Sequence, residues 1–371
     1  MKKIKLLYKK IRGILKRNNL IFSFHRHLTD KDYQRERKRM LSCATKSQKQ
    51  IKKEMTEYAR YWGCPADDYV RYGLFDKNIS MEEILDYVPM QFYYCQFHDE
   101  MFSGVDAKKA DDKLVEYFMF KEKGIPQPDV IGVIRNRKLF SVEQNPISFN
   151  DMITLVQEGE RLFIKPTDGD CGNGIIVVCK KGGRILLKGK DIQSLDDVPL
   201  STTSTYIVQK GLVQRSDFAA INESSLNTLR TIVKYESGDA KIVAMLLRVG
   251  RKGSDVDNSG QGGISIEVNL SDGSLGEYAG REHGGCLFPK HPDTGFVFKN
   301  FKFANWDSVM KQTQNIVSRI TDYKTIGWDI AVCEDKVYAI EMNMGWGIEH
   351  AQTIAGGFRR KMGIYPKKDE Q

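Results

Sequence analysis

The chain has 371 residues, of which 41% are hydrophobic and 28% are charged, so it can bury the cores of two or three domains. This composition excludes a disordered, collagen-like or disulfide-stapled protein. The formal net charge of +9 is unevenly distributed. Residues 1–60 hold 19 Lys or Arg and 5 Asp or Glu, a local net charge of +14, so the rest of the chain has a net charge of −5.

The seven cysteines are widely spaced and form no C-x-x-C pair, so we expect reduced thiols in a cytoplasmic protein. No spacing of Cys and His typical of a zinc site is present. No apolar run approaches the ~20 residues of a membrane span. The start of the chain also lacks the uninterrupted apolar run of a signal peptide.

Residues 1–60 are predicted to be helical and basic. Apolar residues recur at helical spacing among Lys and Arg in the first 17 residues: Ile4, Leu7, Ile11, Ile14 and Leu15. This pattern is typical of a helix that lies on an anionic membrane surface, and equally of a helix packed on its own protein. The charged helical stretch continues through residues 31–62. No groove-reading or base-stacking motif accompanies the charge, so nucleic-acid binding is not favoured.

A short helical pattern covers residues 81–88, and the aromatic cluster at 92–97 is expected in a core. From about residue 107 the pattern changes. Helices are predicted over 112–123, ending at Gly124, and at 150–158 and 306–321. Short β-like runs separated by Gly and Asp fill the rest: VIGVI, LFIKP, GIIVV, YIVQ, TIVKY, KIVAMLLRV, ISIEV, DIAVC and KVYAIEM. Strands in runs with a few helices between them predict an α+β body.

One of these strands, LFIKP, presents Lys165 at its end and is followed by a loop with three glycines in six residues, Gly169, Gly172 and Gly174. Such a loop can fold closely over a phosphate and direct its N–H groups at it, while Lys165 supplies positive charge. It is not a Walker A loop, because no G-K-[ST] follows and the next element is a strand. A glycine-rich β-hairpin without a ligand has the same pattern.

The last two β-like runs carry three oxygen-bearing side chains. Asp329 lies on the first run, and Glu341 and Asn343 are two residues apart, so they share one face of the second. Grouped among apolar neighbours, these oxygens are costly without a cation, and hard oxygen ligands suit Mg²⁺. A hairpin whose polar face is simply solvated is the alternative.

Two further stretches could contact a ligand. Arg230, near the start of the run TIVKY, could grip a phosphate or carboxylate bidentately, or form a surface ion pair. The Gly- and Asx-rich segment 255–265 predicts either a mobile substrate loop or a long turn.

In this order, the stretches resemble an ATP-grasp fold, an α+β fold in which two lobes clasp ATP. The closer resemblance is to the sugar-transfer-associated ATP-grasp family, which is found among genes for capsule and exopolysaccharide assembly. It covers roughly residues 107–355 and is carried by SLNTLRTIV, DNSGQGGISIEV, DGSLG, HPDTG and IGWDIAVCEDKVYAIEMNMGWG. It implies a first lobe over 106–206 with the glycine-rich phosphate loop and a second lobe over 207–371 with the metal-binding hairpin. Residues 1–105 would form a basic helical N-terminal region.

The resemblance also implies roles for individual residues at the phosphate end. Lys113, eleven residues before Gly124, and Lys165 match the lysines that contact ATP phosphates. The loop from Gly169 to Gly174, with Gly172 and Asn173, would close over the triphosphate. Asp329, Glu341 and Asn343 match the Mg²⁺ ligands. Arg230 would act with Lys165 in catalysis, by stabilising the transferring phosphate and an acyl phosphate.

At the other end of the nucleotide, the resemblance implies a hinge whose backbone binds adenine. It consists of Gln209, Lys210, Gly211 and Leu212, and the family often has Glu where Gln209 stands. Asp217, a little downstream, would bind the ribose.

The implied activity is an ATP- and Mg²⁺-dependent carboxylate–amine ligase that works through an acyl phosphate. A sugar acid, an amino sugar or an amino acid would be among its substrates, in polysaccharide biosynthesis. Two alternatives stay open: an ATP-grasp phosphotransferase, and a scaffold of a glycan-assembly complex that binds ATP without chemistry.

The sequence departs from the family pattern on the substrate side, where Met344, Gly345 and Trp346 replace the Pro-containing turn of many ATP-grasp ligases. We expect a cytoplasmic protein, with residues 1–17 as a peripheral contact to the inner face of the membrane.

Overall fold

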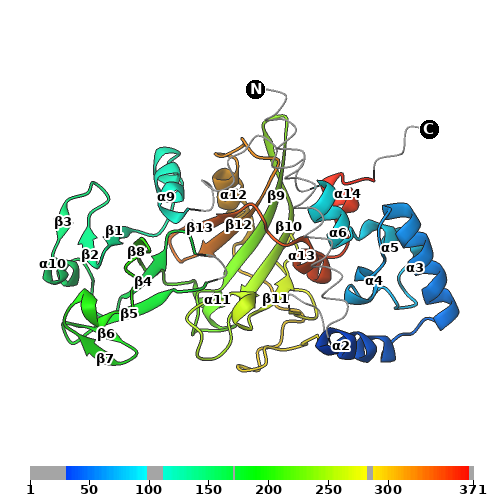
Figure 1. The fold of residues 1–371 in the computed structure, drawn as a ribbon, viewed down its shortest axis with the longest axis horizontal. Coiled ribbons are helices and arrows are strands. Elements are labelled where there is room, and N and C mark those ends of the chain that lie inside the picture. The colour runs from blue at the N-terminus through cyan, green and yellow to red at the C-terminus, as the bar shows by residue number, and fades with distance from the viewer. Residues whose placement is uncertain (1–30, 98–111, 170–171, 282–286, 367–371) are drawn as a thin grey trace. The chain divides into compact units, whose positions relative to one another are not determined.

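The structure, a computed structural model, describes residues 31–97, 112–169, 172–281 and 287–366. The predicted amphipathic helix at residues 1–17 lies outside these ranges. The chain forms two compact units, shown with their helices and strands in Figure 1. The first consists of residues 1–104, 280–287 and 347–371, and the second of residues 105–279 and 288–346. The division into three regions at 105/106 and 206/207 stays a prediction.

The described part of the first unit is helical. Its elements are α2 (Lys31–Ser42), α3 (Gln48–Trp62), α4 (Asp68–Arg71), α5 (Met81–Asp86), α6 (Met90–Phe92), a π-helical segment η1 (Tyr93–Phe97), α13 (Ile348–Ala355) and α14 (Arg359–Met362). The helical character predicted for residues 31–62 and 81–88 is confirmed, although 31–62 forms two helices and not one. Among the described helices, none is both long and apolar enough to span a bilayer.

The sequence explains where α3 begins and ends. The Ser47 hydroxyl accepts a hydrogen bond from the Gln50 N–H at 3.2 Å, and Gly63 ends the helix with a φ of 66°. Ile51, Tyr58 and Trp62 recur along one buried face of the helix. Segments far apart in the sequence meet in this unit, because the Gln352 side chain on α13 accepts from the Val88 N–H at 2.6 Å and donates to the Val88 carbonyl at 2.8 Å.

The second unit contains two antiparallel sheets. The larger has the strand order β3-β2-β1-β8-β4-β5-β6-β7: β1 (Val130–Arg135), β2 (Lys138–Phe140), β3 (Pro146–Ile147), β4 (Arg161–Pro166), β5 (Ile176–Lys181), β6 (Arg184–Leu187), β7 (Lys190–Ile192) and β8 (Tyr206–Lys210). The smaller has the order β11-β10-β9-β12-β13: β9 (Thr228–Glu236), β10 (Asp239–Val249), β11 (Ile264–Glu267), β12 (Thr325–Val332) and β13 (Val337–Asn343). The predicted α+β body is confirmed.

Helices accompany both sheets of the second unit: α9 (Lys113–Glu122), α10 (Phe149–Thr154), η2 (Leu195–Asp197), α11 (Ser216–Ala219), η3 (Ser259–Gln261) and α12 (Trp306–Val317). The Asp112 carboxylate caps α9 by accepting from the N–H groups of Leu114 and Val115 at 2.9 and 3.1 Å. Phe120 of α9 stacks on Trp328 of β12, with ring centroids 5.7 Å apart. This packing holds α9, which begins at Lys113, against the smaller sheet.

The period of two along β4 and β8 separates a core face from an open face. Leu162 and Ile164 on β4 and Val208 on β8 belong to the hydrophobic core of the larger sheet. The alternate positions, Phe163 and Gln209, lie directly opposite each other in the strand register. They therefore share the other face, which is the face that turns toward the smaller sheet.

Candidate functional site

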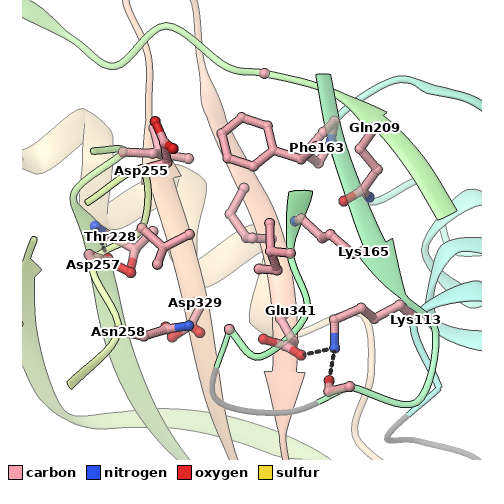
Figure 2. Close-up of a pocket in the computed structure, with 18 of the residues that line it drawn as sticks. Lys113, Phe163, Lys165, Gln209, Thr228, Asp255, Asp257, Asn258, Asp329 and Glu341 are labelled. Carbon is pink, nitrogen blue, oxygen red and sulfur yellow. Dashed lines mark hydrogen bonds and ion pairs between the residues drawn. The ribbon is translucent and has the colours of Figure 1, made fainter. Parts of the chain in front are cut away.

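A pocket lies between the two sheets of the second unit, and Figure 2 shows its lining. It combines three kinds of side chain. The basic residues are Lys113, Lys165 and Lys210, and the acidic residues are Asp255, Asp257, Asp329 and Glu341. The apolar part of the lining includes Phe163, Ile175, Leu212, Leu226, Val256 and Ile340. A pocket with apolar walls and opposed charges suits a flat ring attached to an anionic group.

Lys165 is the pocket's unpaired cation. It stands two residues after Phe163 on β4, on the same face, with its Nζ atom 5.8 Å from the centroid of the Phe163 ring. Within the described parts of the chain it has no hydrogen-bond or ion-pair partner. Desolvation by the surrounding protein, with repulsion from Lys113, lowers the pKa of the Lys165 ammonium group below its ordinary value. Glu341, the nearest source of opposing charge, acts on Lys165 only through space, so an anion entering the pocket would meet a cation without a direct partner.

Lys113, in the first turn of α9, joins the two sheets. Its Nζ atom lies 2.8 Å from the Glu341 carboxylate on β13 and donates to the Gly169 carbonyl at 2.5 Å (Figure 2). Burial alone would lower the pKa of Lys113, but the carboxylates of Glu341 and Glu116 raise it above its ordinary value. Lys113 is therefore charged at neutral pH and partly neutralised by Glu341.

The glycine-rich loop reaches across the pocket toward the loop between β10 and β11. Gly172 has a φ of 72°, and a Cβ atom there would lie 2.2 Å from the Asn258 amide nitrogen. The positive φ favours glycine here, and a larger residue would also push the Asn258 side chain aside. Gln261 donates from its side chain to the Gly172 carbonyl at 3.2 Å. Gly169, Gly172 and Asn173 line the pocket, whereas residues 170 and 171 lie outside the described ranges.

The segment that follows β8 borders the apolar end of the pocket. The Lys210 N–H donates to the Asp129 carbonyl at 2.8 Å, and the Gly211 N–H donates to the Arg161 carbonyl at 2.7 Å. Both N–H groups are thus used by the protein itself. Leu212, the next residue, lines the pocket, and its N–H has no backbone acceptor among the described residues.

The smaller sheet presents a row of paired charges. In the strand register, Asp329 of β12 lies opposite Arg230 of β9 and opposite Glu341 of β13, so all three share one face. Arg230 donates to the two Asp329 carboxylate oxygens at 2.7 and 3.3 Å. The period of two predicted that Glu341 and Asn343 share a face of β13, and the register places Asp329 of the neighbouring strand opposite Glu341.

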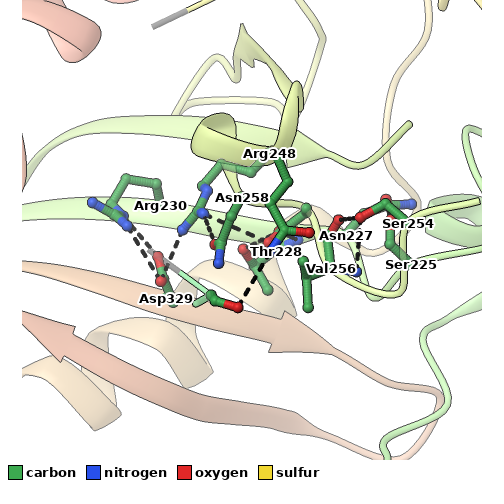
Figure 3. A network of polar contacts seen from close by, with 12 residues as sticks. Ser225, Asn227, Thr228, Arg230, Arg248, Ser254, Val256, Asn258 and Asp329 are labelled. Carbon is green, nitrogen blue, oxygen red and sulfur yellow. Dashed lines mark hydrogen bonds and ion pairs between the residues drawn. The ribbon is translucent and has the colours of Figure 1, made fainter. Parts of the chain in front are cut away.

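Arg248 of β10 is the second cation on Asp329 (Figure 3). It donates to the carboxylate at 2.9 Å, and both side chains are 7% exposed. Burial alone would raise the pKa of Asp329, but the guanidinium groups of Arg230 and Arg248 lower it to about 2. Asp329 is therefore ionised and bound between two arginines.

The loop between β10 and β11 is fixed to this network. The Asp257 carboxylate accepts from the Thr228 N–H at 2.9 Å and from the Thr228 hydroxyl at 2.5 Å. Burial raises the pKa of Asp257 in spite of nearby Arg248. Arg248 also donates to the Asn258 side chain. The long segment predicted as a loop at 255–265 is thus anchored at one end of the pocket.

The three candidate metal ligands come together on the smaller sheet. The Asn343 amide donates to the Asp329 carboxylate at 3.4 Å, and Glu341 lies opposite Asp329. No group of three His, Cys, Asp or Glu that could hold a metal occurs among the described residues. Two carboxylates and an amide do fit Mg²⁺, which usually takes one or two carboxylates and keeps water or phosphate oxygens. Glu341 has one carboxylate oxygen beyond the Lys113 contact, whereas both Asp329 oxygens accept from arginine.

Glu116 lies under this hairpin and was not predicted from the sequence. Its side chain on α9 is 4% exposed and accepts from the Met342 N–H. Burial and repulsion from Glu341 raise the pKa of Glu116 well above its ordinary value. Its role is to hold β13 against α9, one residue from Glu341.

The structure brings most of the predicted site residues to the pocket but not all of them. The lining includes Lys113, Lys165, Gly169, Gly172, Asn173, Gln209, Lys210, Gly211, Leu212, Asp329 and Glu341. Gly174, Arg230 and Asn343 lie next to lining residues. Asp217 differs: Arg215 binds its carboxylate at 2.7 Å through two nitrogens, and it accepts from the Ala304 N–H at 3.1 Å. It is not part of the pocket lining.

Arg248 was not predicted as part of the site, and Asp255 and Asp257 were predicted only as members of a loop that could contact a substrate. Arg248 is the one charge in the last eight residues of the run KIVAMLLRV. This signal could have marked it, because a charge in a buried strand needs a partner. Asp255 lines the apolar end of the pocket, and its carboxylate lies 3.6 Å from Arg161.

A family model described as "sugar-transfer associated ATP-grasp" matches residues 94–361 of the chain. No curated protein matches the chain.

Several solved structures match at low similarity. They include D-alanyl-alanine synthetase A from Vibrio cholerae (10% identity, 69% of this chain and 63% of that chain, TM-score 0.38) and an ADP complex of N5-carboxyaminoimidazole ribonucleotide synthetase (14%, 74% and 61%, TM-score 0.38). A D-alanine–D-alanine ligase from Bacillus anthracis matches at 12% identity, over 66% of this chain and 58% of that chain, with a TM-score of 0.34. The chain thus spans less than two thirds of that ligase. With TM-scores this low, these likenesses carry no argument about the site.

Proposed function

This chain belongs to the sugar-transfer-associated ATP-grasp family, and on that premise we propose that it is an ATP- and Mg²⁺-dependent ligase that joins a carboxylate to an amine. The observation that carries the proposal is the pocket between the sheets. Lys165 and Lys113 stand on one side of it, and the carboxylates of Asp329 and Glu341 stand on the other. A triphosphate with a bound divalent cation needs both kinds of group.

In this proposal the nucleotide runs from the apolar end of the pocket to the charged end. The base lies against Phe163, Leu212 and Ile340, beside the segment Gln209–Leu212. The phosphates lie at Lys165 and Lys113, under the loop from Gly169 to Gly174. The unpaired state of Lys165 supports this direction, because a phosphate would supply the partner that the ammonium group lacks.

Two carboxylates are candidates for the ribose hydroxyls. Asp217 is the residue that the sequence suggests, but its carboxylate is bound by Arg215 and by the Ala304 N–H. Asp255 lines the pocket beside Phe163 (Figure 2), and its side chain is 55% exposed. The geometry favours Asp255, since it is exposed and its one ion pair, with Arg161 at 3.6 Å, leaves carboxylate lone pairs for two hydroxyls.

Asp329, Glu341 and Asn343 would hold the Mg²⁺, whose charge neutralises phosphate oxygens when it is bound. Arg248 and Arg230 keep the Asp329 carboxylate ionised and oriented. We propose Lys165 and Arg230 as the catalytic residues, because both place positive charge close to where phosphoryl oxygens would lie. Positioning and charge neutralisation suffice for this chemistry, so no protein nucleophile is required.

The proposed reaction has two steps. A carboxylate oxygen of the first substrate attacks the γ-phosphorus of ATP, the bond to the bridging oxygen breaks, and ADP leaves with that electron pair. The nitrogen of an amine then attacks the carbonyl carbon of the acyl phosphate. The C–O bond to phosphate breaks, the nitrogen loses a proton, and an amide and inorganic phosphate result.

The family's description supports a role for this ligase in polysaccharide biosynthesis. A sugar acid, an amino sugar or an amino acid that decorates a glycan precursor, such as one for a capsule, would then supply the carboxylate or the amine. A cytoplasmic location follows from such precursors and from ATP. We also propose that residues 1–17 contact the anionic inner face of the membrane, because their basic and apolar residues alternate at helical spacing.

Product analysis tests the proposed reaction. The full chain is incubated with ATP, Mg²⁺ and one carboxylate and one amine at a time, drawn from sugar acids, amino sugars and amino acids. The products are separated and identified by mass spectrometry. We expect ADP, phosphate and an amide in equal amounts. ADP with a phosphorylated acceptor would assign a phosphotransferase, and binding of ATP without any ADP would assign a scaffold; either result contradicts the ligase.

Sedimentation with anionic vesicles tests the membrane contact. We expect the full chain to sediment with them and the chain without residues 1–17 to stay in solution. Equal sedimentation of both chains would contradict the contact.

A further inference from the structure

The segment HPDTG, which begins at His291, contributes no residue to the pocket lining, and the proposed reaction makes no use of it. His291 is fully buried. Its Nδ1 atom accepts from the N–H groups of Asp293 and Thr294 at 3.3 and 3.2 Å, so Nδ1 has no proton. Nε2 therefore has the proton and donates it to the Gly250 carbonyl at 2.9 Å. The neutral imidazole thus joins this turn to the residue that directly follows β10.

A second contact from the HPDTG turn holds the residues after Gly250. The Asp293 carboxylate accepts from the Arg251 guanidinium at 2.5 and 3.0 Å and from the Lys252 N–H at 3.0 Å. A bidentate pair of this kind fixes orientation as well as distance. The turn therefore anchors three consecutive residues, 250 to 252, at the start of the loop between β10 and β11.

The anchored residues lie beside the part of the loop that lines the pocket. A Cβ atom on Gly250 would lie 2.7 Å from the Val256 carbonyl, so these two backbone segments are in contact. The Ser254 N–H donates to the Arg251 carbonyl at 2.9 Å, and the Ser254 hydroxyl donates to the Val256 carbonyl at 2.6 Å (Figure 3). Asp255 stands between Ser254 and Val256. The contacts of the turn therefore reach the backbone on both sides of Asp255.

The Asp255 side chain itself contributes little to its own position, because it is exposed and its ion pair with Arg161 is 3.6 Å long. The loop is instead held before and after it. The HPDTG turn is the anchor before Asp255, and the bonds from Thr228 to Asp257 are the anchor after it. A carboxylate on a loop that is already ordered loses less conformational freedom when a ligand binds.

We propose that His291 and Asp293 are positioning residues for the ribose of the nucleotide. By anchoring residues 250 to 252, they hold the Asp255 carboxylate where the ribose hydroxyls bind. This inference rests on the proposed nucleotide site and on Asp255 as its ribose ligand. It adds that a turn outside the pocket determines how well the site recognises the sugar.

His291→Asn separates the two contacts of the imidazole. The Asn amide oxygen can replace Nδ1 as the acceptor for the N–H groups of the turn, but the shorter side chain does not reach the Gly250 carbonyl. This carbonyl still accepts from the Asn222 amide at 3.2 Å, so the substitution does not leave it without a partner. We therefore expect the variant to fold and keep the turn, but to lose the anchor on Gly250.

The measurement is the preference of the full chain for ADP over 2′,3′-dideoxy-ADP. Both are titrated with Mg²⁺ by calorimetry, since neither has a γ-phosphate to transfer. The wild-type chain should prefer ADP about tenfold. His291→Asn should reduce the preference to about threefold or less, because the carboxylate must then be ordered as the ribose binds.

Two further single variants frame this result. Arg251→Gln weakens the contact with Asp293 at a partly exposed position and should also reduce the preference. Lys290→Ala is the matched control, because Lys290 is exposed and directly precedes His291. It should keep the preference of the wild-type chain.

A double variant shows whether His291 acts through Asp255. In a chain that already carries Asp255→Asn, adding His291→Asn should cause no further loss of ADP affinity, because the ribose contact is already weakened. An additional loss as large as that in the wild-type background would contradict action through Asp255.

An unchanged preference in the folded His291→Asn chain would overturn the proposal, since the turn would then stabilise the fold alone. Arg251→Gln decides in the same way if His291→Asn does not fold. Equal affinity of the wild-type chain for the two nucleotides would overturn the ribose contact and this inference with it, while leaving the nucleotide site in place. Failure of the wild-type chain to bind ADP at all would instead contradict the nucleotide site itself.

Discussion

The two sheets that line the pocket present their polar side chains in opposite states. On the larger sheet, Lys165 faces the pocket without a direct partner among the described residues. On the smaller sheet, Asp329 is held by Arg230 and Arg248 at 2.7 and 2.9 Å. One wall is therefore open to a ligand, and the other is already balanced in charge.

This difference indicates how each wall would respond to a bound nucleotide. Groups without partners gain hydrogen bonds and lose none, so the larger sheet is preorganised for binding. Groups in a buried ion-pair network must exchange partners, and their first contribution is to the stability of the fold. We therefore expect substitutions on the smaller sheet to lower both stability and activity, and substitutions of the pocket residues on the larger sheet to weaken binding without lowering stability.

The largest effect is expected when the two carboxylates of the hairpin are compared. Both Asp329→Ala and Glu341→Ala should abolish ADP release from ATP. Asp329→Ala should also lower the free energy of unfolding by about 3–5 kcal/mol, because it removes the carboxylate that Arg230 and Arg248 share and leaves Arg248 with the more distant Asp257 at 3.7 Å. Glu341 is 30% exposed and, among the described residues, forms an ion pair with Lys113 alone, so its loss should cost less than about 1 kcal/mol.

Denaturant unfolding, followed by circular dichroism, measures the stability difference between the two variants, and a coupled ADP assay measures turnover. Equal free energies of unfolding for the two variants would contradict the difference between Asp329, which is bound by two arginines, and the more exposed Glu341. Near-normal Mg²⁺-dependent ADP release in either variant would contradict its assignment as a metal ligand.

The next effect concerns Lys165 on the open wall. Lys165→Ala should weaken binding of a non-hydrolysable ATP analogue by about ten- to a hundredfold, because a charge-assisted contact to phosphate is lost. The free energy of unfolding should stay the same or rise by about 1 kcal/mol, since the variant removes a desolvated charge without a partner.

Lys138→Ala is the control for this substitution, because Lys138 is exposed on β2 of the same sheet. Its affinity should match that of the wild-type chain. If Lys165→Ala destabilised the fold as much as Asp329→Ala, the distinction between the two walls would be lost.

A smaller effect distinguishes the two ribose candidates. The wild-type chain should bind ADP about tenfold more tightly than 2′,3′-dideoxy-ADP, because a carboxylate accepts from the hydroxyls. Asp255→Asn should reduce this preference, and Asp217→Asn should leave it intact. Calorimetric titrations of the three chains measure the ratio. If Asp217→Asn reduced the preference and Asp255→Asn left it intact, Asp217 would be the residue that binds the ribose.

The smallest effect is a change of affinity with pH. The pKa of Lys165 is lowered, so its ammonium group loses its proton below the ordinary lysine value of 10.5. ATP-analogue affinity should fall a few-fold as the pH rises through this lowered pKa, and Lys165→Arg should remove the fall. The unfolded chain binds more protons in this window, so stability should rise with pH there. Affinity that is constant up to 10.5 would contradict the desolvated state of Lys165.

Local patterns in the sequence predicted much of the fold and the positions of several pocket residues on their strands. The apolar run LFIKP placed Lys165 at the end of β4, and the spacing of Glu341 and Asn343 placed them on one face of β13. The short strands β2, β3, β6 and β7 were not predicted, because they have two to four residues and too little period to detect.

The ion-pair network of the smaller sheet could not be predicted in the same way. Arg248 and Asp329 are 81 residues apart, and their contact depends on the strand order β10-β9-β12, which no local pattern specifies. The position of Asp217 outside the pocket lining could not be predicted for the same reason. Its carboxylate accepts a hydrogen bond from the N–H of Ala304, which lies in a loop distant in the sequence. Contacts between segments that are distant in the sequence decide which charged side chains stay available to a ligand.

The central claim is that a nucleotide and a divalent cation bind together between Lys165 on one sheet and the carboxylates on the other. Titration of the full chain with a non-hydrolysable ATP analogue, with Mg²⁺ and then with a chelator, tests it most directly. We predict saturable binding at a single site with Mg²⁺, weakened about tenfold or more by the chelator. No saturable binding at millimolar nucleotide, or equal affinity with and without Mg²⁺, would contradict the account.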